Sequence, residues 1–394
     1  MKSIAVITGT RADYGLLYWV IKGLHESHDF QLQLLVCGAH LQAQFGETRT
    51  EIESDGFPIT RTVEFSCNTR EPAAMSRSTG EAVIGFSQAF SELEPQMLIV
   101  LGDRFEAFAA TQAATLMNIP IAHLHGGELT EGAVDDCLRH AMTKLSQIHF
   151  VAAEEYRRRV IQLGEQPERV FSVGATGLES LLKEPLMTEA DLLESLPIDK
   201  FDSPFFLITY HPETNAADGN GSVEPLLSVL DRYPDALLLI TAPNLDRGGD
   251  ALLERLKQFS QPRSNAVFVE SLGRRRYLSC LSLVDCVIGN SSSGLIEVPS
   301  FGKPTVNIGD RQKGRLSADS VLHVANDLEA INRGIEVALS EEFVEICRGV
   351  VNPYGQGNTS ERILEVLRTL DWALFDRGKA FYDISFDCPP DEEH

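Results

Sequence analysis

The chain has 394 residues, 43% of them hydrophobic, and its 57 acidic and 34 basic side chains give a formal net charge of −23. This composition excludes a disordered or collagen-like chain, and the length predicts two domains of ordinary size. The acidic balance argues against nucleic acid or a membrane surface as a partner, because both recruit basic surfaces, but it leaves open a small anionic ligand in one pocket.

Short apolar runs that do not alternate with polar residues recur through the first half of the chain. Runs rich in Ile, Val and Leu are typical of strands that are buried on both faces of a parallel sheet. The predicted strands are residues 4–7, 32–36, 97–101, 119–122 and 149–152, and the predicted helices are 16–25, 81–92, 105–117 and 136–146. Alternating strands and helices predict right-handed βαβ units and a doubly wound α/β sheet.

The same pattern restarts in the second half, after loop-like stretches that indicate a domain boundary at residues 170–177 and 196–204. Further strands are predicted at 205–209, 236–241, 266–269, 285–288 and 305–308, and a last helix at 359–370. We therefore predict an N-terminal α/β domain at residues 1–172, a C-terminal α/β domain at 173–370, and a tail at 371–394. The tail is acidic at its end, and we expect it to be frayed.

The seven cysteines form no C-x-x-C pair, so neither a zinc ribbon nor a disulfide framework is expected. The first apolar run stops at Gly9, too early for a signal peptide, and no run approaches the roughly 18 residues of a membrane helix. We therefore expect a soluble, cytoplasmic protein with reduced thiols.

Ligands of open α/β sheets bind at the carboxyl ends of the strands, so the loops that follow the strands are the candidate sites. Arg11 lies between two glycines after the first strand, an arrangement that suits either an anion or a plain tight turn. Asp103 and Arg104 follow the third strand, where Asp103 either caps the next helix or acts in catalysis.

Two histidines and a glutamate follow the fourth run, at residues 119–122, in the pattern H-x-H-x-x-E of His123, His125 and Glu128. This is not the helical spacing of a zinc site and no third histidine is nearby, so a metal is not favoured. The paired glycines before Glu128 favour a close approach of substrate to the backbone. Asp135 begins the next helix, either to complement the helix dipole or as a desolvated base.

The strongest local signal is the loop at residues 289–297, which leaves a strand and enters a helix. Ser291 and Ser292, with the flanking glycines and backbone N–H groups, are typical of a phosphate cradle, whereas simple capping would need one serine. Glu297 lies one helical turn later, placed to accept hydrogen bonds from a sugar diol.

Three other residues in the second half follow predicted strands. His211 and Asn244 end strands, and His211 is as well explained by a structural as by a functional role. Arg311 lies in a loop with a local basic excess, which is either a solvated loop or a source of forked hydrogen bonds to a phosphate.

Taken together, these loops resemble the hydrolysing UDP-N-acetylglucosamine 2-epimerases of sialic acid biosynthesis. The matching segments occur in the family's order across residues 9–315: Thr10-Arg11-Ala12-Asp13-Tyr14, Gly102-Asp103-Arg104, Gly126-Gly127-Glu128, Asp135-Asp136 with Arg139-His140, His211-Pro212, Pro243-Asn244-Leu245-Asp246, Gly289-Asn290-Ser291-Ser292 with Glu297, and Gly309-Asp310-Arg311-Gln312. No single motif is specific, but the ordered set is.

The resemblance implies the GT-B fold: two Rossmann-like doubly wound domains with a cleft between them, and UDP mainly on the second. It also implies that the last helix crosses back toward the first domain, and we expect part of the tail to pack there. In the implied reaction UDP is eliminated to leave a 2-acetamidoglycal, and water then adds with inversion at C2 to give N-acetylmannosamine. The implied partner is a UDP-sugar, no metal or redox cofactor is implied, and a homodimer or higher homo-oligomer is the usual expectation.

The resemblance also implies roles for individual residues. Asp103 and Asp135 match the family's catalytic acids. The positions that match the neighbourhood of the diphosphate are Arg11, Arg104, His211, Ser291, Ser292 and Arg311, with His211 also a catalytic candidate. Asn244 and Glu297 match positions near the uridine and ribose.

One departure from the family pattern leaves two questions open. Several relatives have a catalytic glutamate where this chain has His125, so either His125 or Glu128 performs that acid–base step. The sugar is also open, because close relatives act on UDP-N,N′-diacetylbacillosamine in legionaminic acid synthesis. A GT-B glycosyltransferase and a non-catalytic nucleotide-sugar binder are the other candidate functions.

Overall fold

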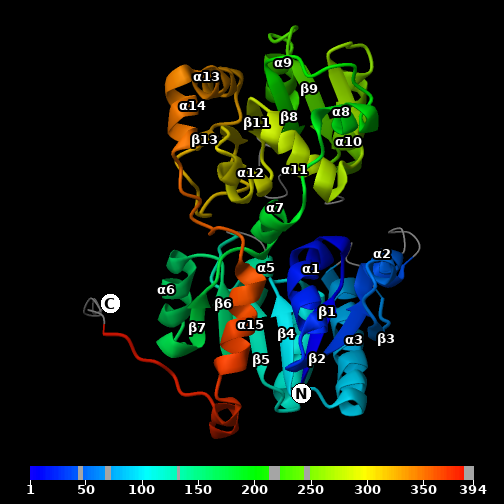
Figure 1. Cartoon of the computed structure of the whole chain (residues 1–394), viewed down its shortest axis with the longest axis vertical. Coiled ribbons are helices and arrows are strands. Elements are labelled where there is room, and N and C mark those ends of the chain that lie inside the picture. Colours follow the sequence, from blue (N-terminus) through cyan, green and yellow to red (C-terminus); the bar gives the residue numbers. More distant parts are fainter. Residues whose placement is uncertain (43–47, 67–71, 131–133, 213–221, 244–248, 386–394) are drawn as a thin grey trace. The chain divides into compact units, whose positions relative to one another are not determined.

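The computed structural model describes residues 1–42, 48–66, 72–130, 134–212, 222–243 and 249–385. The chain forms two compact units, each with its own parallel sheet (Figure 1). Unit 1 comprises Met1–Leu129, Ala133–Glu179 and Asn358–His394, and unit 2 comprises Thr130–Gly132 and Ser180–Gly357. Within the described residues, no helix is both long and apolar enough to span a bilayer.

Unit 1 contains a seven-stranded sheet in the order β3-β2-β1-β4-β5-β6-β7. Its strands are β1 (Lys2–Thr8), β2 (Phe30–Cys37), β3 (Ile59–Val63), β4 (Met97–Leu101), β5 (Ile121–Leu124), β6 (Ile148–Val151) and β7 (Val170–Ser172). Its helices are α1 (Arg11–Glu26), α2 (Arg49–Ser54), α3 (Pro72–Leu93), α4 (Phe105–Leu116), α5 (Val134–Leu145), α6 (Glu154–Gln162) and α15 (Thr359–Thr369), with 3₁₀ turns η1 (Gly38–Leu41), η3 (Pro167–Arg169), η4 (Thr176–Leu178) and η6 (Trp372–Arg377). Because the strand order runs outward in both directions from β1 and β4, the sheet is doubly wound, as predicted.

Unit 2 contains a six-stranded sheet in the order β10-β9-β8-β11-β12-β13. Its strands are β8 (Phe205–Thr209), β9 (Leu237–Thr241), β10 (Ala266–Val269), β11 (Cys286–Gly289), β12 (Thr305–Ile308) and β13 (Val321–Val324). Its helices are α8 (Glu189–Ser195), α9 (Glu224–Leu230), α10 (Gly249–Ser260), α11 (Gly273–Leu283), α12 (Ser293–Ile296), α13 (Leu328–Ala338) and α14 (Glu341–Arg348), with the 3₁₀ turn η5 (Val298–Phe301). The short α7 (Glu179–Lys183) begins at the last residue of unit 1 and continues into unit 2.

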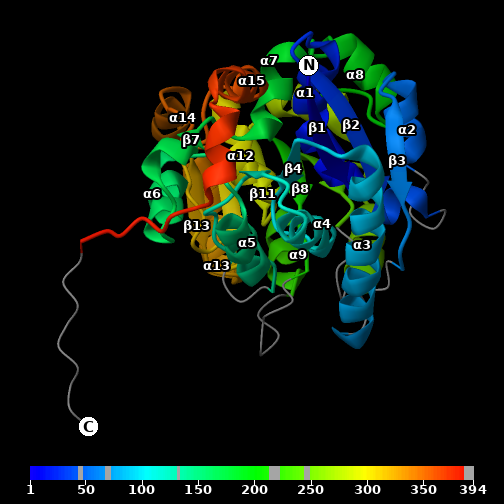
Figure 2. The same ribbon diagram turned by 90° about the horizontal axis from the view of Figure 1, so that it is seen from below.

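The apolar runs form strands because helices cover both faces of each sheet. β4 is buried along its whole length. Its side chains alternate between two core clusters, with Met97, Ile99 and Leu101 in the cluster under α1 and α15, and Leu98 and Val100 in the cluster under α3 and α4. Figure 2 shows these two pairs of helices on opposite sides of the sheet. A strand with two apolar environments needs no polar residues, so its sequence does not alternate.

β5, which was predicted to begin at residue 119, begins two residues later, at Ile121. Asn118 adopts a positive φ of 57°, and Pro120 has no N–H to donate to the sheet. Pairing with β4 instead starts where Leu98 N donates to Pro120 O at 2.8 Å. The shift places His123 inside the strand and His125 directly after it.

The predicted domain limits at residues 172 and 370 were wrong. The segment at residues 170–177, predicted as a boundary, contains β7 of the first sheet, and unit 1 continues to Glu179. Unit 1 also includes the chain from Asn358 onward, so α15 belongs to it; this moves the predicted limit at 370 and agrees with the return of the last helix to the first domain that the resemblance implied. The physical reason is the apolar face of α15, which completes the core over α1 with Ile363, Leu364 and Leu367.

A glycine in α1 permits this packing of α15. A Cβ at Gly23 would lie 2.5 Å from Leu364 Cδ1, so the missing side chain leaves room for Leu364 of α15 to pack directly against α1 (Figure 1). After η6, residues 379–382 contact other parts of unit 1, so the expectation of a frayed tail does not hold for these residues. The acidic end at 386–394 lies outside the described residues.

Candidate functional site

The predicted acid–base residues of unit 1 follow neighbouring strands or begin the helix beside them. Asp103 follows β4, His125 and Glu128 follow β5, and Asp135 lies in the first turn of α5. β4 and β5 are adjacent in the sheet, so their carboxyl ends bring these residues to one edge.

Asp103 is held by a buried arginine. Arg139, whose side chain is 3% exposed, forms an ion pair through Nη2 with Asp103 Oδ2. Its Nη1 donates to Glu128 O at 2.9 Å and to Asp136 Oδ1 at 3.4 Å. One guanidinium therefore joins the loop after β4 to the loop after β5. The alternative role predicted for Asp103, capping α4, is not observed: the N-cap residue of α4 is Arg104, and the helix begins without a side-chain cap. Sequence reasoning matched Arg139 to the family motif but did not assign it to the site.

His125 and Glu128 form a hydrogen-bonded pair. His125 Nδ1 lies 2.7 Å from Glu128 Oε1, and the backbone N–H of Thr176 donates to His125 Nε2 at 3.3 Å. Because Nε2 accepts a hydrogen bond from Thr176 N–H, Nδ1 carries the ring proton and donates it to the carboxylate. His125 itself adopts a positive φ of 63°, which is uncommon for a histidine. Thr176 was missed, since its segment was predicted as a domain boundary.

His123 does not share the partners of His125. Its Nε2 lies 2.7 Å from Gly102 O and its Nδ1 lies 3.2 Å from Thr143 Oγ1. Burial lowers the pKa of His123 to about 3, so the ring is neutral and holds the backbone just before Asp103. In the part of the chain that the structure describes, no group of three His, Cys, Asp or Glu residues could hold a metal.

Arg104 joins a second acidic cluster at the ends of β1 and β4. Its Nη2 donates to Glu106 Oε1 at 3.0 Å, and its Nε lies 3.9 Å from Asp13 Oδ2. Burial raises the pKa of Asp13 to about 6 despite the nearby guanidinium. Arg11 is not drawn into this cluster, since its side chain is 58% exposed and pairs with Glu51 at 3.1 Å.

In unit 2, one buried asparagine organises the predicted anion-binding residues. Asn290 Oδ1 accepts from His211 N at 2.7 Å, and its Nδ2 donates to His211 O at 2.9 Å. Its own carbonyl accepts from Arg311 Nη1 at 3.1 Å and from Gln312 Nε2 at 2.8 Å. His211 and Arg311 are thereby fixed beside the loop that carries Ser291 and Ser292. Sequence reasoning did not give Asn290 this role.

Glu297 lies behind the serine loop. Burial raises the pKa of Glu297, and its Oε2 is buried without a hydrogen-bond partner among the described residues. A buried acceptor of this kind suits a ligand that brings hydroxyl donors. Asn244, the other residue predicted near the uridine, lies outside the described residues.

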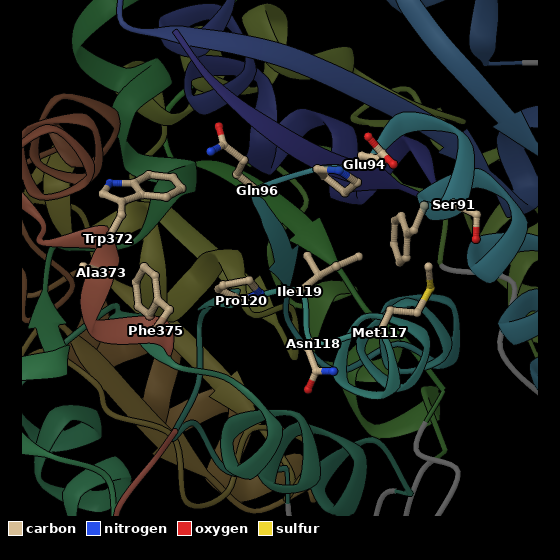
Figure 3. A pocket seen from close by; sticks show the side chains of 12 residues that line it. Ser91, Glu94, Gln96, Met117, Asn118, Ile119, Pro120, Trp372, Ala373 and Phe375 are labelled. Atoms are coloured by element: carbon tan, nitrogen blue, oxygen red, sulfur yellow. The ribbon is translucent and has the colours of Figure 1, made fainter. Parts of the chain in front are cut away.

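The sheet of unit 1 has a separate cavity of about 770 Å³ at its other end. Figure 3 shows Trp372 and Phe375 of η6 across this cavity from Ile119 and Pro120, which precede β5. It lies at the amino ends of β4 and β5, and none of the predicted site residues lines it. The cavity is therefore distinct from the candidate site.

Comparison with known proteins matches most of the chain to one family. The family profile described as UDP-N-acetylglucosamine 2-epimerase matches residues 22–368. The polysialic acid biosynthesis protein P7 of Escherichia coli is 35% identical over 386 residues, 98% of each chain. The GDP/UDP-N,N′-diacetylbacillosamine 2-epimerase (hydrolyzing) of Campylobacter jejuni is 37% identical, over 87% of this chain and 88% of that one. The UDP-N,N′-diacetylbacillosamine 2-epimerase (hydrolyzing) of Legionella pneumophila is 35% identical, over 94% and 96%.

Solved structures agree on the fold. The UDP-GlcNAc 2-epimerase of Neisseria meningitidis bound to UDP-GlcNAc superposes with a TM-score of 0.80 at 21% identity, covering 94% of this chain and 100% of that one. A UDP-GlcNAc 2-epimerase of Listeria monocytogenes, described as putative, gives a TM-score of 0.79 at 19% identity, covering 97% and 99%. The predicted GT-B architecture of two Rossmann-like units is confirmed.

Proposed function

The chain belongs to the UDP-N-acetylglucosamine 2-epimerase family, and from that premise we propose that it is a hydrolysing 2-epimerase that converts UDP-N-acetylglucosamine to N-acetylmannosamine and UDP. The observation that carries the proposal is the arrangement around Arg139 in unit 1. This guanidinium binds the Asp103 carboxylate and the Glu128 carbonyl, and Glu128 is paired in turn with His125. Such oriented acid–base groups fit proton transfer at a carbon, and simple glycosyl transfer needs fewer of them.

In the proposed first step, a carboxylate removes the C2 proton while the C1–O bond to UDP breaks. The C2 proton is a very weak acid, so the base must be close, oriented and ionised. Asp103 meets the second condition, because the buried guanidinium of Arg139 pairs with its carboxylate and orients it. Asp135, on the first turn of the helix that carries Arg139, is proposed as the second carboxylate of this step.

In the second step, water adds its hydroxyl to C1 of the glycal and releases a proton to the Glu128 carboxylate, which then delivers a proton to C2 on the face opposite to the one that lost its proton in the first step. We assign this proton transfer to Glu128, with His125 as its positioning partner. The support is that both ring nitrogens of His125 are engaged, by Glu128 and by the backbone of Thr176. A histidine held in this way orients the carboxylate and has no ring nitrogen left for substrate.

We assign UDP to unit 2. His211, Arg311 and the hydroxyls of Ser291 and Ser292 would contact the diphosphate, because Asn290 bonds to His211 and Arg311 and directly precedes the two serines in the chain. Glu297, with its unpartnered buried oxygen, would accept from the ribose hydroxyls. Growing charge on the departing diphosphate would then meet preorganised donors.

The same chemistry on UDP-N,N′-diacetylbacillosamine is the second candidate. It is favoured by the names of the Campylobacter and Legionella relatives, which are 37% and 35% identical to this chain. Both substrates place the reacting C1–C2 bond and an acetamido group in the same relation to UDP, so the proposed proton transfers serve either one.

Incubation with each UDP-sugar in D₂O, followed by proton NMR, tests the proposal. We expect free UDP and a 2-epimeric sugar that carries deuterium at C2. Retention of hydrogen at C2 would contradict elimination, and release of an intact UDP-linked epimer would contradict hydrolysis. Turnover of only the bacillosamine derivative would change the substrate and leave the mechanism standing.

A further inference from the structure

Two helices of unit 1 each contribute an arginine that donates a hydrogen bond to the turn that carries Glu128. Arg139 of α5 donates to Glu128 O at 2.9 Å, and Arg159 of α6 donates to Gly127 O at 2.5 Å. The turn also packs directly on α6, because a Cβ at Gly127 would lie 2.6 Å from Tyr156 O. The position of the Gly127–Glu128 turn therefore depends on how α5 and α6 are held.

The far end of α5 is held by a lysine from the C-terminal segment. Lys379 Nζ donates to Ser146 O at 2.6 Å, to Lys144 O at 2.7 Å and to Thr143 O at 3.3 Å. These carbonyls belong to the last turn of α5 and the residue after it, where helical carbonyls lack intrahelical partners and a cation is favoured.

The same lysine connects α5 to the end of α6. Glu165, three residues beyond α6 and with a side chain only 1% exposed, accepts from Lys379 Nζ at 2.6 Å and from Lys144 Nζ at 2.7 Å. His149 Nε2 of β6 lies 2.9 Å from the same carboxylate. Burial alone would raise the pKa of Glu165, but these hydrogen bonds outweigh it and lower the pKa to about 2. A buried carboxylate with these partners is costly to leave unpaired.

Three further contacts, made by Phe381 and Tyr382, hold the segment beside α6. Tyr382 N donates to Gly164 O at 2.9 Å, and the Phe381 ring covers Gly164, which has no space there for a side chain. Lys144 Nζ lies 4.8 Å from the centre of the Phe381 ring. The contacts of residues 379–382 thus reach the ends of both helices.

We propose that residues 379–382, here called the C-terminal clasp, position the catalytic Gly127–Glu128 turn by locking α5 and α6 together at their far ends. Lys379 is a positioning residue in this arrangement and does not touch substrate. The clasp restrains the two helices from which Arg139 and Arg159 reach the turn, and it also restrains the helix whose first turn carries Asp135. The catalytic part of this inference rests on the proposed function.

The test compares two truncations of the full chain. One ends at Gly378 and removes the clasp, and the matched control ends at Ser385 and keeps it. For the first we expect kcat to fall by about tenfold or more, since small misplacements of catalytic groups carry costs of this order. The KM and the Kd for UDP should stay within about twofold, because the proposed UDP contacts lie in unit 2. The control should match the full chain.

Lys379→Met provides a second variant if the shorter truncation fails to fold, with Lys379→Arg as the conservative comparison. Lys379→Met should show the same loss of kcat at unchanged KM, and Lys379→Arg should recover part of it. A full kcat in Lys379→Met, or a loss of kcat and UDP affinity together, would overturn the clasp.

Hydrogen–deuterium exchange separates this proposal from the proposed function. Loss of the clasp should raise exchange at residues 126–128 and along the first turn of α5, with unit 2 unchanged. Unchanged protection at the turn overturns the clasp even if activity falls. If the full-length protein turns over no UDP-sugar while the exchange changes as expected, the proposed function is wrong and the clasp stands.

Discussion

Acid–base residues in unit 1 are set apart by their partners more than by their positions in the sequence. Asp103 pairs with a guanidinium, Glu128 with an imidazole, and Asp13 lies 3.9 Å from Arg104 beside the buried Glu106. An opposite charge stabilises a carboxylate, whereas burial and a neighbouring carboxylate destabilise it. Three acids at one edge of one sheet thus have different electrostatic surroundings, which permits different roles.

The pairing of His125 with Glu128 predicts unequal effects of their substitution. Glu128→Gln should lower kcat by about 10²-fold or more, because it removes a proton-transferring group. His125→Asn should lower kcat by about tenfold, because an amide N–H can still donate to the carboxylate. Steady-state release of UDP measures both, with Asp235→Asn on the surface of unit 2 as the control. A larger loss in His125→Asn than in Glu128→Gln would reverse the assignment.

Asp13 predicts a dependence of stability on pH. Burial raises its pKa to about 6 in the folded state, above its ordinary value of 3.8. Between these values the folded state binds more protons than the unfolded state, so this group's contribution to stability falls as pH rises through that window. Asp13→Asn removes the ionisation. The variant should therefore gain stability relative to wild type between about pH 4.5 and about pH 7.5, by on the order of 1–3 kcal/mol.

Urea unfolding of Asp13→Asn and wild type at both pH values measures this difference. The exposed Asp235→Asn supplies the baseline for removing one surface charge. A difference between Asp13→Asn and wild type that is the same at both pH values would show that Asp13 is ionised throughout, and the assignment of a raised pKa would fail.

Residue types at strand ends could be predicted, but the partners that fix them could not. Asp103, Glu128 and His211 follow strands, and a strand end is visible in the sequence. Arg139 and Asn290 matter through side-chain contacts with backbone groups, at 2.9 Å to Glu128 O and 2.7 Å to His211 N, and Thr176 matters through its own backbone N–H, 3.3 Å from His125 Nε2. Such contacts depend on which loops lie together in space, and no local pattern encodes them.

At the scale of elements, the central strands were predictable because a strand buried on both faces is apolar throughout. The strands that sequence reasoning missed, β3, β7 and β13, lie at sheet edges. β3 and β13 expose part of their side chains, so their sequences are mixed. The membership of α15 was not predictable from its own periodicity, because the same apolar face would suit either core.

The end of β11 lies so close to the end of β8 that adding one methyl group at Gly289 should strongly reduce stability and UDP binding. Gly289 has a φ of +141°, and a Cβ there would lie 1.9 Å from Thr209 O, a backbone atom. Gly289→Ala must therefore move the strand end that starts the loop of Asn290, Ser291 and Ser292. We expect it to destabilise the protein by about 3 kcal/mol or more and to abolish UDP binding.

Thermal unfolding and titration with UDP check this expectation. Gly80→Ala is the matched control, because Gly80 lies inside α3 and has no atom within 4 Å of the added Cβ. There the substitution should be neutral or stabilising by up to about 1 kcal/mol, since alanine favours helix. If Gly289→Ala kept both its unfolding temperature and its affinity for UDP, the β8–β11 contact would not be needed for the site.

At the scale of the whole molecule, the net charge of −23 and an anionic ligand are compatible because charge is distributed unevenly. Unit 1 holds the proposed acid–base carboxylates, whereas the candidate anion site of unit 2 contains His211 and Arg311 around Asn290. If the functions are divided in this way, substitutions in one unit should affect proton transfer and substitutions in the other should affect nucleotide binding.

This division can be tested by the effect of UDP on thermal stability. UDP that binds only the folded state should stabilise it by about 2.7 kcal/mol at about 100 times its Kd. Arg311→Ala should weaken this stabilisation, because it removes a donor beside the serine loop and leaves the Asn290 carbonyl with fewer partners. Asp103→Asn, in unit 1, should keep the full stabilisation by UDP while kcat falls by about 10²-fold or more. Equal loss of UDP stabilisation in both variants would show that nucleotide binding and proton transfer are not divided between the two units.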